Sequence, residues 1–315
     1  MYKFILTVVV LLNLSVNAFA RENVKIVGSS TIFPFSNTVA DYFDKEDIFP
    51  EPIIESTGSG DGINLFCKGI GIEFPDIVAS SRRVTEEEIH DCKKNGVNKF
   101  TELKIGYDGI AFVTSGDMAG KILTLNNIWR ALSPYGGPNK QRNVGLPQVW
   151  SEIDEDLPER AIKVILPPPT SGTRASLIEL AMQKGCLFQS SAAAKCDQLK
   201  EDSSIMEGTE DDFALIGYAY LSSNANTISA LSIDGILPSS ETIQKRTYPL
   251  SRPLFLYVKN RHVEIIPGME EFLFEFTSDA ALGTKGYLIN KGLVPMTNDE
   301  LKAESYKATS EIYEK

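Results

Sequence analysis

Residues 167–180 read PPPTSGTRASLIEL, a stretch in which an extended segment turns into a helix. The prolines end any preceding regular structure, because proline has no backbone N–H and restricts the residue before it. Ser171, Gly172 and Thr173 then open an apolar helical pattern with no bulky side chain over its first turn. Such a turn is either an ordinary helix cap or a site for an anion, since the first N–H groups of a helix have no partners within it.

Comparable loops follow three predicted strands in the first third of the chain. Strands are expected at 24–27, 53–55 and 76–79, because these runs are short, apolar and rich in β-branched residues. Each precedes a loop rich in small, hydroxyl or arginine residues. The loops are Gly28-Ser29-Ser30-Thr31, Thr57-Gly58-Ser59-Gly60 and Ser80-Ser81-Arg82-Arg83.

Further strands at 109–114, 164–166, 213–218 and 254–258 alternate with helical patterns. One helix is expected to begin near Pro34, and another after Thr85, with Thr85 as N-cap and Glu88 at the capping-box position. This alternation predicts an α/β fold with mostly parallel sheets. Ligands of such folds bind beyond the carboxyl ends of strands, so the loops predict one anion site in a cleft between two lobes.

Residues 1–20 have the pattern of a secretory signal peptide. Lys3 is followed by the apolar run FILTVVVLLNLSV and by Ala18-Phe19-Ala20, a small-x-small cleavage signal. The apolar run is shorter than the roughly 20 residues of a membrane-spanning helix. We therefore expect cleavage after Ala20 and export to the periplasm, with an uncleaved anchor as the alternative.

The formal net charge of the 315-residue chain is −11, and removal of residues 1–20 would make it one unit more negative. An acidic surface argues against nucleic acid or an anionic membrane as the main partner. It does not exclude a small anionic ligand, because a buried site depends on local donors. We expect a monomer.

The four cysteines of an exported chain predict disulfides, and four cysteines allow three connectivities. Pairing of neighbours, Cys67 with Cys92 and Cys186 with Cys196, keeps each bridge within one region and is the expected arrangement. No CxxC motif is present, so neither a metal site nor a cofactor is predicted.

Enzyme motifs are absent from the sequence. GSGDG at 58–62 does not have the form of a nucleophile elbow, and no GxxxxGK[ST] phosphate loop occurs. His90 falls in a charged helix, and His262 is expected near a lobe surface. We expect a protein that is not an enzyme.

Five segments together resemble the periplasmic phosphate-binding proteins of phosphate-specific ABC transporters. They are GSSTIFPFS (28–36), TGSGDG (57–62), ASSRRV (79–84), PPPTSGTRASLIELAMQKGC (167–186) and TYPLSRPLFLYVK (247–259). The resemblance runs from about residue 24 to 295. It implies a type II periplasmic binding-protein fold with lobe I at 21–105 and 252–315, lobe II at 106–251, and one phosphate bound between them.

The same resemblance implies the ligand contacts, loop by loop. The first loop would place Ser30, Thr31 and the amide of Ile32 on phosphate, and the second would place Ser59. The loop that opens the helix would contribute Ser171, Gly172 and Thr173.

Two positions depart from the best-known members of this family. Ser81 stands where they have an aspartate, and Pro167 stands where they have an arginine four residues before Ser-Gly-Thr. The positions of Arg82 and Arg174 make them the expected cationic contacts, with Ser81 beside them.

The missing aspartate bears on selectivity, because an acceptor distinguishes protonated phosphate from sulfate. Asp61 is the expected proton acceptor, with Asp108 and Glu207 as weaker candidates. The implied function is capture of inorganic phosphate and delivery to a membrane permease with its ATPase. Alternatives are a binder of sulfate or molybdate, a secreted phosphatase-like hydrolase, and a surface or adhesion protein.

Overall fold

The computed structural model describes residues 21–43, 48–114, 118–167, 171–186, 195–200, 213–218, 221 and 229–313. Residues 1–20, Thr170 and Glu207 lie outside these ranges, so the predicted signal peptide and the roles considered for those two residues stay untested. Among the described residues, no helix has both the length and the apolar character needed to cross a bilayer.

The first part of the chain alternates strands and helices as predicted. Its elements are β1 (Lys25–Gly28), α1 (Phe33–Phe43), β2 (Ile53–Ser56), α2 (Ser59–Phe66), β3 (Ile77–Ser80), α3 (Glu86–Lys94), β4 (Phe100–Thr114), β5 (Ile122–Leu123), α4 (Leu125–Leu132), η3 (Trp150–Glu152) and β6 (Val164–Ile165).

The second part is richer in short helices. Its elements are α5 (Gly172–Ser176), the π-helical η4 (Leu177–Met182), α6 (Gln183–Gly185), β7 (Phe213–Gly217), β8 (Ser229–Ala230), β9 (Ser232–Ile233), α8 (Ser240–Gln244), β10 (Ser251–Lys259), α9 (Asn260–Val263), α10 (Met269–Phe276), α11 (Asp279–Leu282), η6 (Ile289–Lys291), α12 (Asn298–Thr309) and η7 (Glu311–Tyr313).

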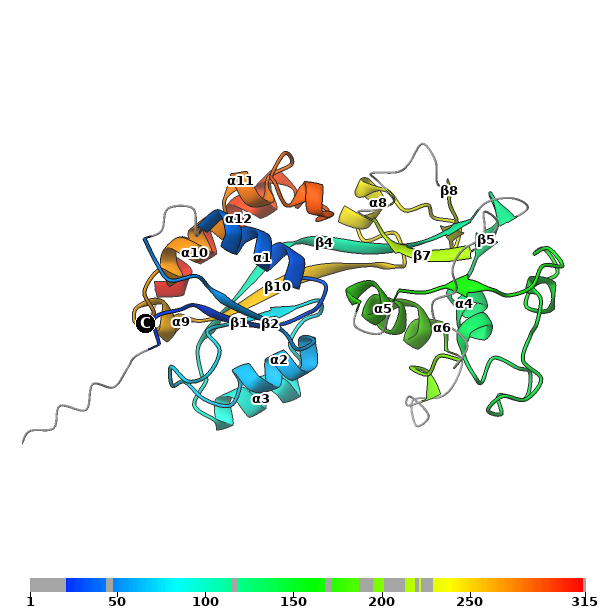
Figure 1. The fold of residues 1–315 in the computed structure, drawn as a ribbon, viewed down its shortest axis with the longest axis horizontal. Coiled ribbons are helices and arrows are strands. Elements are labelled where there is room, and N and C mark those ends of the chain that lie inside the picture. The colour runs from blue at the N-terminus through cyan, green and yellow to red at the C-terminus, as the bar shows by residue number, and fades with distance from the viewer. Residues whose placement is uncertain are drawn as a thin grey trace, which may run out of the picture.

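One sheet of order β2-β1-β3-β10-β4-β7-β6 runs through the molecule, and β8 also pairs with β4. Figure 1 shows α1, α10 and α12 over one face of its first half and α2 and α3 over the other. The long strand β4 pairs with β10 as far as Gly109 and with β7 from Ile110 onward. These two strands therefore connect the two halves seen in Figure 1. The division of the chain at 105/106 and 251/252 stays a prediction.

The main sheet is mixed, with both parallel and antiparallel pairs of strands. Among the described residues, β1 is parallel to β2 and β3, and β6 to β7, but β10 and β4 run antiparallel to every strand they pair with. The antiparallel pairs of this mixed sheet thus all involve the two strands that join the halves. β4 also begins nine residues before the predicted strand, because its start (FTELK) has neither a continuous apolar run nor a regular alternation of polar and apolar residues.

A buried polar cluster attaches the N-terminal segment to the sheet. Asp76 accepts hydrogen bonds from Arg21 at 2.7 Å, from the Lys25 N–H at 2.6 Å and from His262 Nδ1 at 2.6 Å. Burial raises the pKa of Asp76, but the bonds from His262, Arg21 and Lys25 outweigh it and hold the pKa below its usual value. His262 is thus fully buried in a structural contact, which corrects its predicted place near a lobe surface.

Both disulfides have the predicted connectivity. Cys67, at the end of α2, is bonded to Cys92 in α3, and Cys186 is bonded to Cys196. The described residues contain no free cysteine and no group of His, Cys, Asp and Glu side chains that could hold a metal.

Helix α12 is held against β4 by an ion pair that also caps the helix. Lys104 Nζ lies 2.6 Å from Glu300 Oε1, Tyr107 Oη donates to the same oxygen at 2.7 Å, and the Thr297 N–H donates to Oε2 at 2.9 Å. Burial raises the pKa of Glu300, but these donors outweigh it and lower the pKa to about 2.

We expect Glu300→Gln to lower the free energy of unfolding by about 1–2 kcal/mol at pH 7, because a partly exposed pair gives less than its pKa shift implies. The folded-state pKa lies below the unfolded value, so this contribution is complete above about pH 4.5 and is lost as the pH falls through about 2. Urea titrations between pH 2 and 7 measure it. Glu241→Gln, which breaks an exposed pair with Lys245, is the control. A pH-independent difference would contradict this origin.

Candidate functional site

The first predicted loop and the start of α5 meet in one cavity of about 260 Å³. Its walls come from both halves of the molecule and include most of the residues predicted from those two loops. The lining residues include Ser30, Thr31, Asp108, Ser171, Gly172, Thr173, Tyr218 and Lys291. Lys291, on η6, was not anticipated from the sequence, because nothing in its neighbourhood marks a binding loop.

Two glycines permit close backbone contacts beside this cavity. Gly28 has φ +129°, and a Cβ there would lie 2.1 Å from the Ala79 carbonyl oxygen, so β1 can pass into the loop only with glycine at this position. Gly172 opens α5 directly against the loop, and a Cβ there would lie 2.6 Å from Thr31 Oγ1 and 2.7 Å from Thr31 N. Any side chain at Gly172 would therefore separate the two halves.

Ser171 is the N-cap of α5, and its side chain accepts from the Thr173 N–H at 3.2 Å. Helical structure continues from Gly172 through η4 and α6 to Gly185. The positive end of this helical segment therefore faces the cavity. The predicted anion-binding turn and the predicted cap are the same structure.

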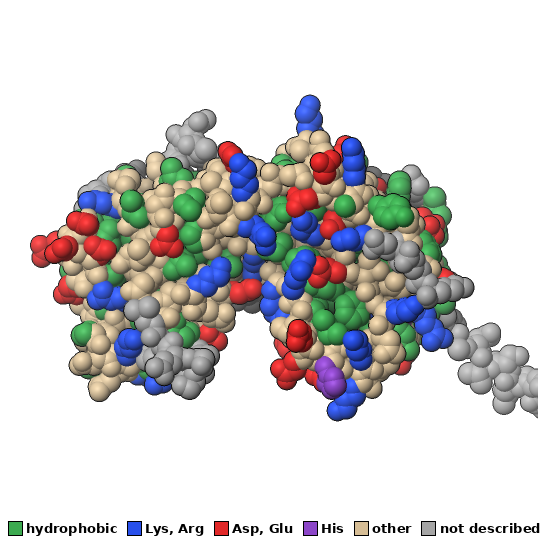
Figure 2. Space-filling model, turned by 180° about the vertical axis from the view of Figure 1, so that it is seen from behind, with side chains coloured by type: hydrophobic (Ala, Val, Ile, Leu, Met, Phe, Trp, Pro, Cys, Tyr) green, Lys and Arg blue, Asp and Glu red, His purple; other side chains and the backbone are tan. Residues whose placement is uncertain are grey.

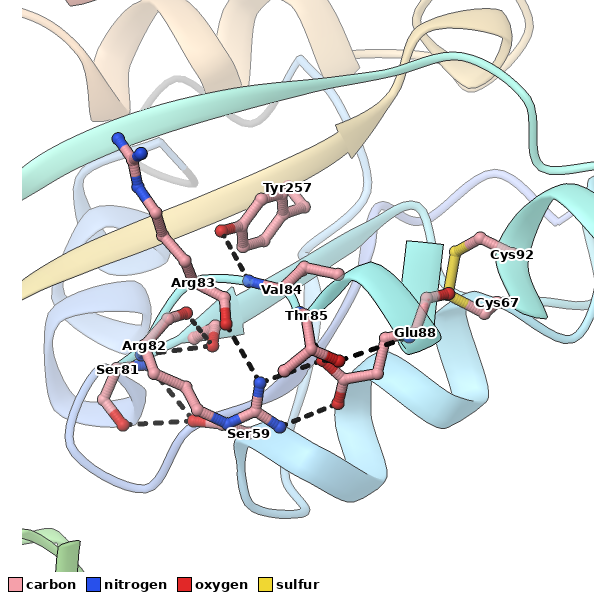
Figure 3. A network of polar contacts seen from close by, with 11 residues as sticks. Ser59, Cys67, Ser81, Arg82, Arg83, Val84, Thr85, Glu88, Cys92 and Tyr257 are labelled. Carbon is pink, nitrogen blue, oxygen red and sulfur yellow. Dashed lines mark hydrogen bonds and ion pairs between the residues drawn. A yellow bond between two sulfur atoms is a disulfide. The ribbon is translucent and has the colours of Figure 1, made fainter. Parts of the chain in front are cut away.

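The second and third predicted loops meet each other, as Figure 3 shows. Ser59 Oγ lies 3.1 Å from Ser81 Oγ and accepts from the Ser81 N–H at 3.1 Å. Ser81 and Arg82 line a second, larger hollow, and Ser59 lines neither of the two. The four loops are therefore neighbours, but they do not line one cavity in this structure.

Arg82 is held by Glu88 of α3 in a two-bond ion pair, with distances of 2.9 and 2.7 Å (Figure 3). The bonds from Glu88 raise the pKa of Arg82. Glu88 also accepts from the Thr85 N–H at 2.8 Å, so the predicted capping box is present. The guanidinium predicted to contact an anion is thus occupied by the carboxylate of that capping box.

Three further predicted residues have other surroundings. Arg174 donates to the Pro167 carbonyl at 3.1 Å and does not line the cavity. The amide of Ile32 donates to the Ser29 carbonyl at 3.1 Å, within the turn that starts α1. Asp61 is exposed on the first turn of α2 and lines neither hollow.

Arg252, on β10, is the central cation that sequence reasoning missed. Only 4% of its side chain is exposed. Its guanidinium lies 2.5 Å from Glu179 Oε2, donates to Thr31 Oγ1 at 2.9 Å and donates to Ser176 Oγ. The signal was present, because Arg252 stands within TYPLSRPLFLYVK, a segment used only as evidence of resemblance.

Asp108, on β4, is the acid that faces the cavity. Its Oδ2 lies 3.5 Å from both Arg252 Nε and Ser176 Oγ. Burial raises the pKa of Asp108, and Arg252 opposes that rise. The structure therefore brings to the cavity the weaker of the two aspartates considered from the sequence, and leaves Asp61 outside.

Comparison with known proteins gives consistent similarities. A family model described as a PBP superfamily domain matches residues 15–280. Protein SphX of Synechocystis is 29% identical over 281 residues, covering 85% of this chain and 78% of the relative. The curated relatives include several named phosphate-binding protein PstS.

Solved structures share the architecture. A possible phosphate-binding protein from Planctomyces limnophilus has a TM-score of 0.71 and 22% identity, covering 93% of this chain and 99% of that one. An ABC-type phosphate transport receptor from Vibrio cholerae has a TM-score of 0.61 and 20% identity, covering 86% and 99%. The predicted periplasmic-binding-protein fold is confirmed, and the names of these proteins describe binding proteins and a transport receptor.

We expect Arg252→Met to lower the free energy of unfolding by about 3 kcal/mol, because it leaves the carboxylates of Glu179 and Asp108 without their buried cation. Urea denaturation measures the change. Arg83→Met is the matched control, since the Arg83 side chain is 72% exposed in its pair with Glu102 and should cost less than about 1 kcal/mol. Equal losses in the two variants would contradict a structural role specific to Arg252.

Proposed function

The chain belongs to the PBP superfamily, and from that premise we propose that it binds inorganic phosphate in the cavity between Ser30-Thr31 and the start of α5. The observation that supports this most directly is the meeting of two hydroxyl-rich turns, one from each half, at the positive end of a helical segment. Backbone N–H groups and hydroxyls at a helix N-terminus suit a tetrahedral oxyanion.

The cavity also has the charges that such a ligand requires. Lys291 contributes a cation, and Asp108 contributes a carboxylate beside Arg252. Micromolar affinity needs about 8 kcal/mol, and hydrogen bonds to a charged ligand give roughly 1.5–3 kcal/mol each. A few well-formed bonds from the two turns are therefore sufficient.

The proposed role is that of an exported receptor that delivers phosphate to an ABC importer. In support of it, several curated relatives are named for phosphate binding, and the Vibrio cholerae structure is named a transport receptor. Cleavage near Ala20, a periplasmic location, and lobes at 21–105 with 252–315 and at 106–251 belong to the same proposal, as does contact with a permease and its ATPase.

Ser171→Ala tests the site. We expect it to weaken phosphate binding about tenfold in calorimetric titration, because one hydrogen bond of about 1.5 kcal/mol is lost. Ser278→Ala is the matched control: Ser278 caps α11 by accepting from the Ala281 N–H at 3.1 Å and lies away from the cavity. An equal effect of both variants, or no binding by the wild-type protein, would contradict the proposal.

Asp108→Asn tests selectivity. An ionised carboxylate accepts a hydrogen bond from protonated phosphate and repels sulfate, which has no proton to donate near neutral pH. We expect the ratio of phosphate to sulfate affinity to fall at least tenfold in the variant, and Asp61→Asn to leave it unchanged.

Burial raises the pKa of Asp108, so this carboxylate becomes protonated at a higher pH than the usual aspartate value of about 4. As the pH is lowered, the ratio of phosphate to sulfate affinity of the wild-type protein should therefore begin to fall while the pH is still above about 4. Competition titrations between pH 4 and 8 measure both effects. A large change in Asp61→Asn with none in Asp108→Asn would identify Asp61 as the acceptor.

A further inference from the structure

A second hollow of about 810 Å³ lies beside the proposed phosphate cavity, and we name it the basic cleft. Arg252 lines the basic cleft and also donates to Thr31, which lines the cavity, so the two hollows share a wall. Among the described residues, the lining of the basic cleft includes seven Lys and Arg side chains but only two acids, Glu179 and Glu300. The cations are Arg82, Arg83, Lys104, Lys184, Lys245, Arg246 and Arg252.

This concentration of positive charge contrasts with the rest of an acidic chain. Figure 2 shows Lys and Arg side chains gathered where the two halves meet. A concave surface lined by one sign of charge concentrates ions of the opposite sign. The basic cleft is therefore suited to an anion, unlike the protein surface as a whole.

Within the part of the chain that the structure describes, five of these cations have carboxylate ion-pair partners and the other two have none. Arg82, Arg83, Lys104, Lys245 and Arg252 lie within ion-pair distance of Glu88, Glu102, Glu300, Glu241 and Glu179, respectively.

Lys184 and Arg246 make no ion pair with the described part of the chain. Lys184 Nζ donates to the Pro249 carbonyl at 3.4 Å, and Arg246 is exposed in the turn after α8. Burial lowers the pKa of Lys184; the negative charge of Glu179 opposes this lowering, and the positive charge of Arg252 adds to it. Two cations thus face the basic cleft without an ion-pair partner among the described residues, although the charge of Glu179 partly offsets that of Lys184.

Size and lining indicate the class of anion. The basic cleft is about three times larger than the proposed phosphate cavity, so one orthophosphate would leave most of it unfilled. Its cations come from several separate segments, so an extended ligand with repeated charges can contact more than one of them. Guanidinium groups match the geometry of phosphate oxygens.

We propose that the basic cleft binds a linear condensed phosphate of the triphosphate class, at a site separate from the orthophosphate cavity. This inference does not depend on orthophosphate binding. The probe is inorganic tripolyphosphate, titrated calorimetrically into the full chain in buffer without divalent cations, at low salt and with saturating orthophosphate present. Wild-type protein should bind it, with an affinity that falls as salt is added.

The test variant is Lys184→Gln with Arg246→Asn. Asparagine suits the left-handed backbone at Arg246, where φ is +56°. The matched control is Lys93→Gln with Lys94→Gln, which removes the same charge from the exposed end of α3. Tripolyphosphate affinity should fall at least tenfold in the test variant and less than twofold in the control. Orthophosphate affinity should be retained in both.

Four outcomes would overturn the proposal: no binding of tripolyphosphate, equal losses in the two variants, displacement of tripolyphosphate by orthophosphate at constant ionic strength, and equal affinity for an oligoglutamate of the same charge.

ATP distinguishes the two sources of a triphosphate chain. Binding no tighter than tripolyphosphate supports recognition of the chain alone, whereas much tighter binding would indicate a nucleotide site instead. Failure of orthophosphate to bind would count only against the proposed function.

Discussion

Arg252 is an almost fully buried cation whose guanidinium contacts three separate parts of the chain. From β10 it reaches Glu179 and Ser176 in the helical segment that begins at Gly172, Thr31 in the loop after β1, and Asp108 on β4. A buried charge is tolerated only when it is paired and hydrogen-bonded. The position of each of these groups is therefore constrained by the need to pair one guanidinium. The constraint acts on both sides of the candidate site, because Thr31 belongs to the first loop and Ser176 to the helix that Ser171 caps.

This constraint explains how an acidic protein can contain a site suited to an anion. The net charge is negative, but Arg252 is buried where water screens its charge poorly. The two carboxylates near it, those of Glu179 and Asp108, differ in how closely they pair with it. Glu179 lies at hydrogen-bond distance, whereas Asp108 lies at 3.5 Å without hydrogen-bond geometry, so Arg252 Nε has no hydrogen-bond partner among the described residues. Asp108 is thus the less firmly paired acid, and it is also the one that faces the cavity.

Local sequence signals predicted most of the fold. β1, β2 and β3 were found because each is a short apolar run followed by a glycine or hydroxyl turn, and α3 because Thr85 and Glu88 form a capping box. Three two-residue strands, β5, β8 and β9, were not found, since so few residues show no periodicity. The equally short β6 was found because it lies in the apolar run 164–166 that precedes the prolines. Local patterns therefore predict an element only when it is long enough, or has a cap or turn distinct enough, to show in a few neighbouring residues.

The site was harder to predict, because its chemistry depends on which partner the fold brings to each charged side chain. Arg82 was a reasonable anion contact by position, but Glu88 is only six residues away and takes both of its terminal nitrogens. Arg252 stands in a segment that carries the family resemblance, but nothing in that segment pairs it with Asp108. The two residues meet only because β10 and β4 pair antiparallel with Arg252 opposite Asp108. That register is set by the whole strand pair, so no single motif could have revealed it.

Gly172 adds a steric constraint to this electrostatic one. Because its missing side chain lets α5 approach to within van der Waals contact of Thr31, the two turns stand at a distance that leaves a cavity of about 260 Å³. A larger residue would move α5 away, lengthen the bond from Arg252 to Thr31 and enlarge the cavity at the same time. The size of the cavity and the pairing of the buried cation are therefore not independent, since both depend on the close approach of this one glycine to the loop after β1.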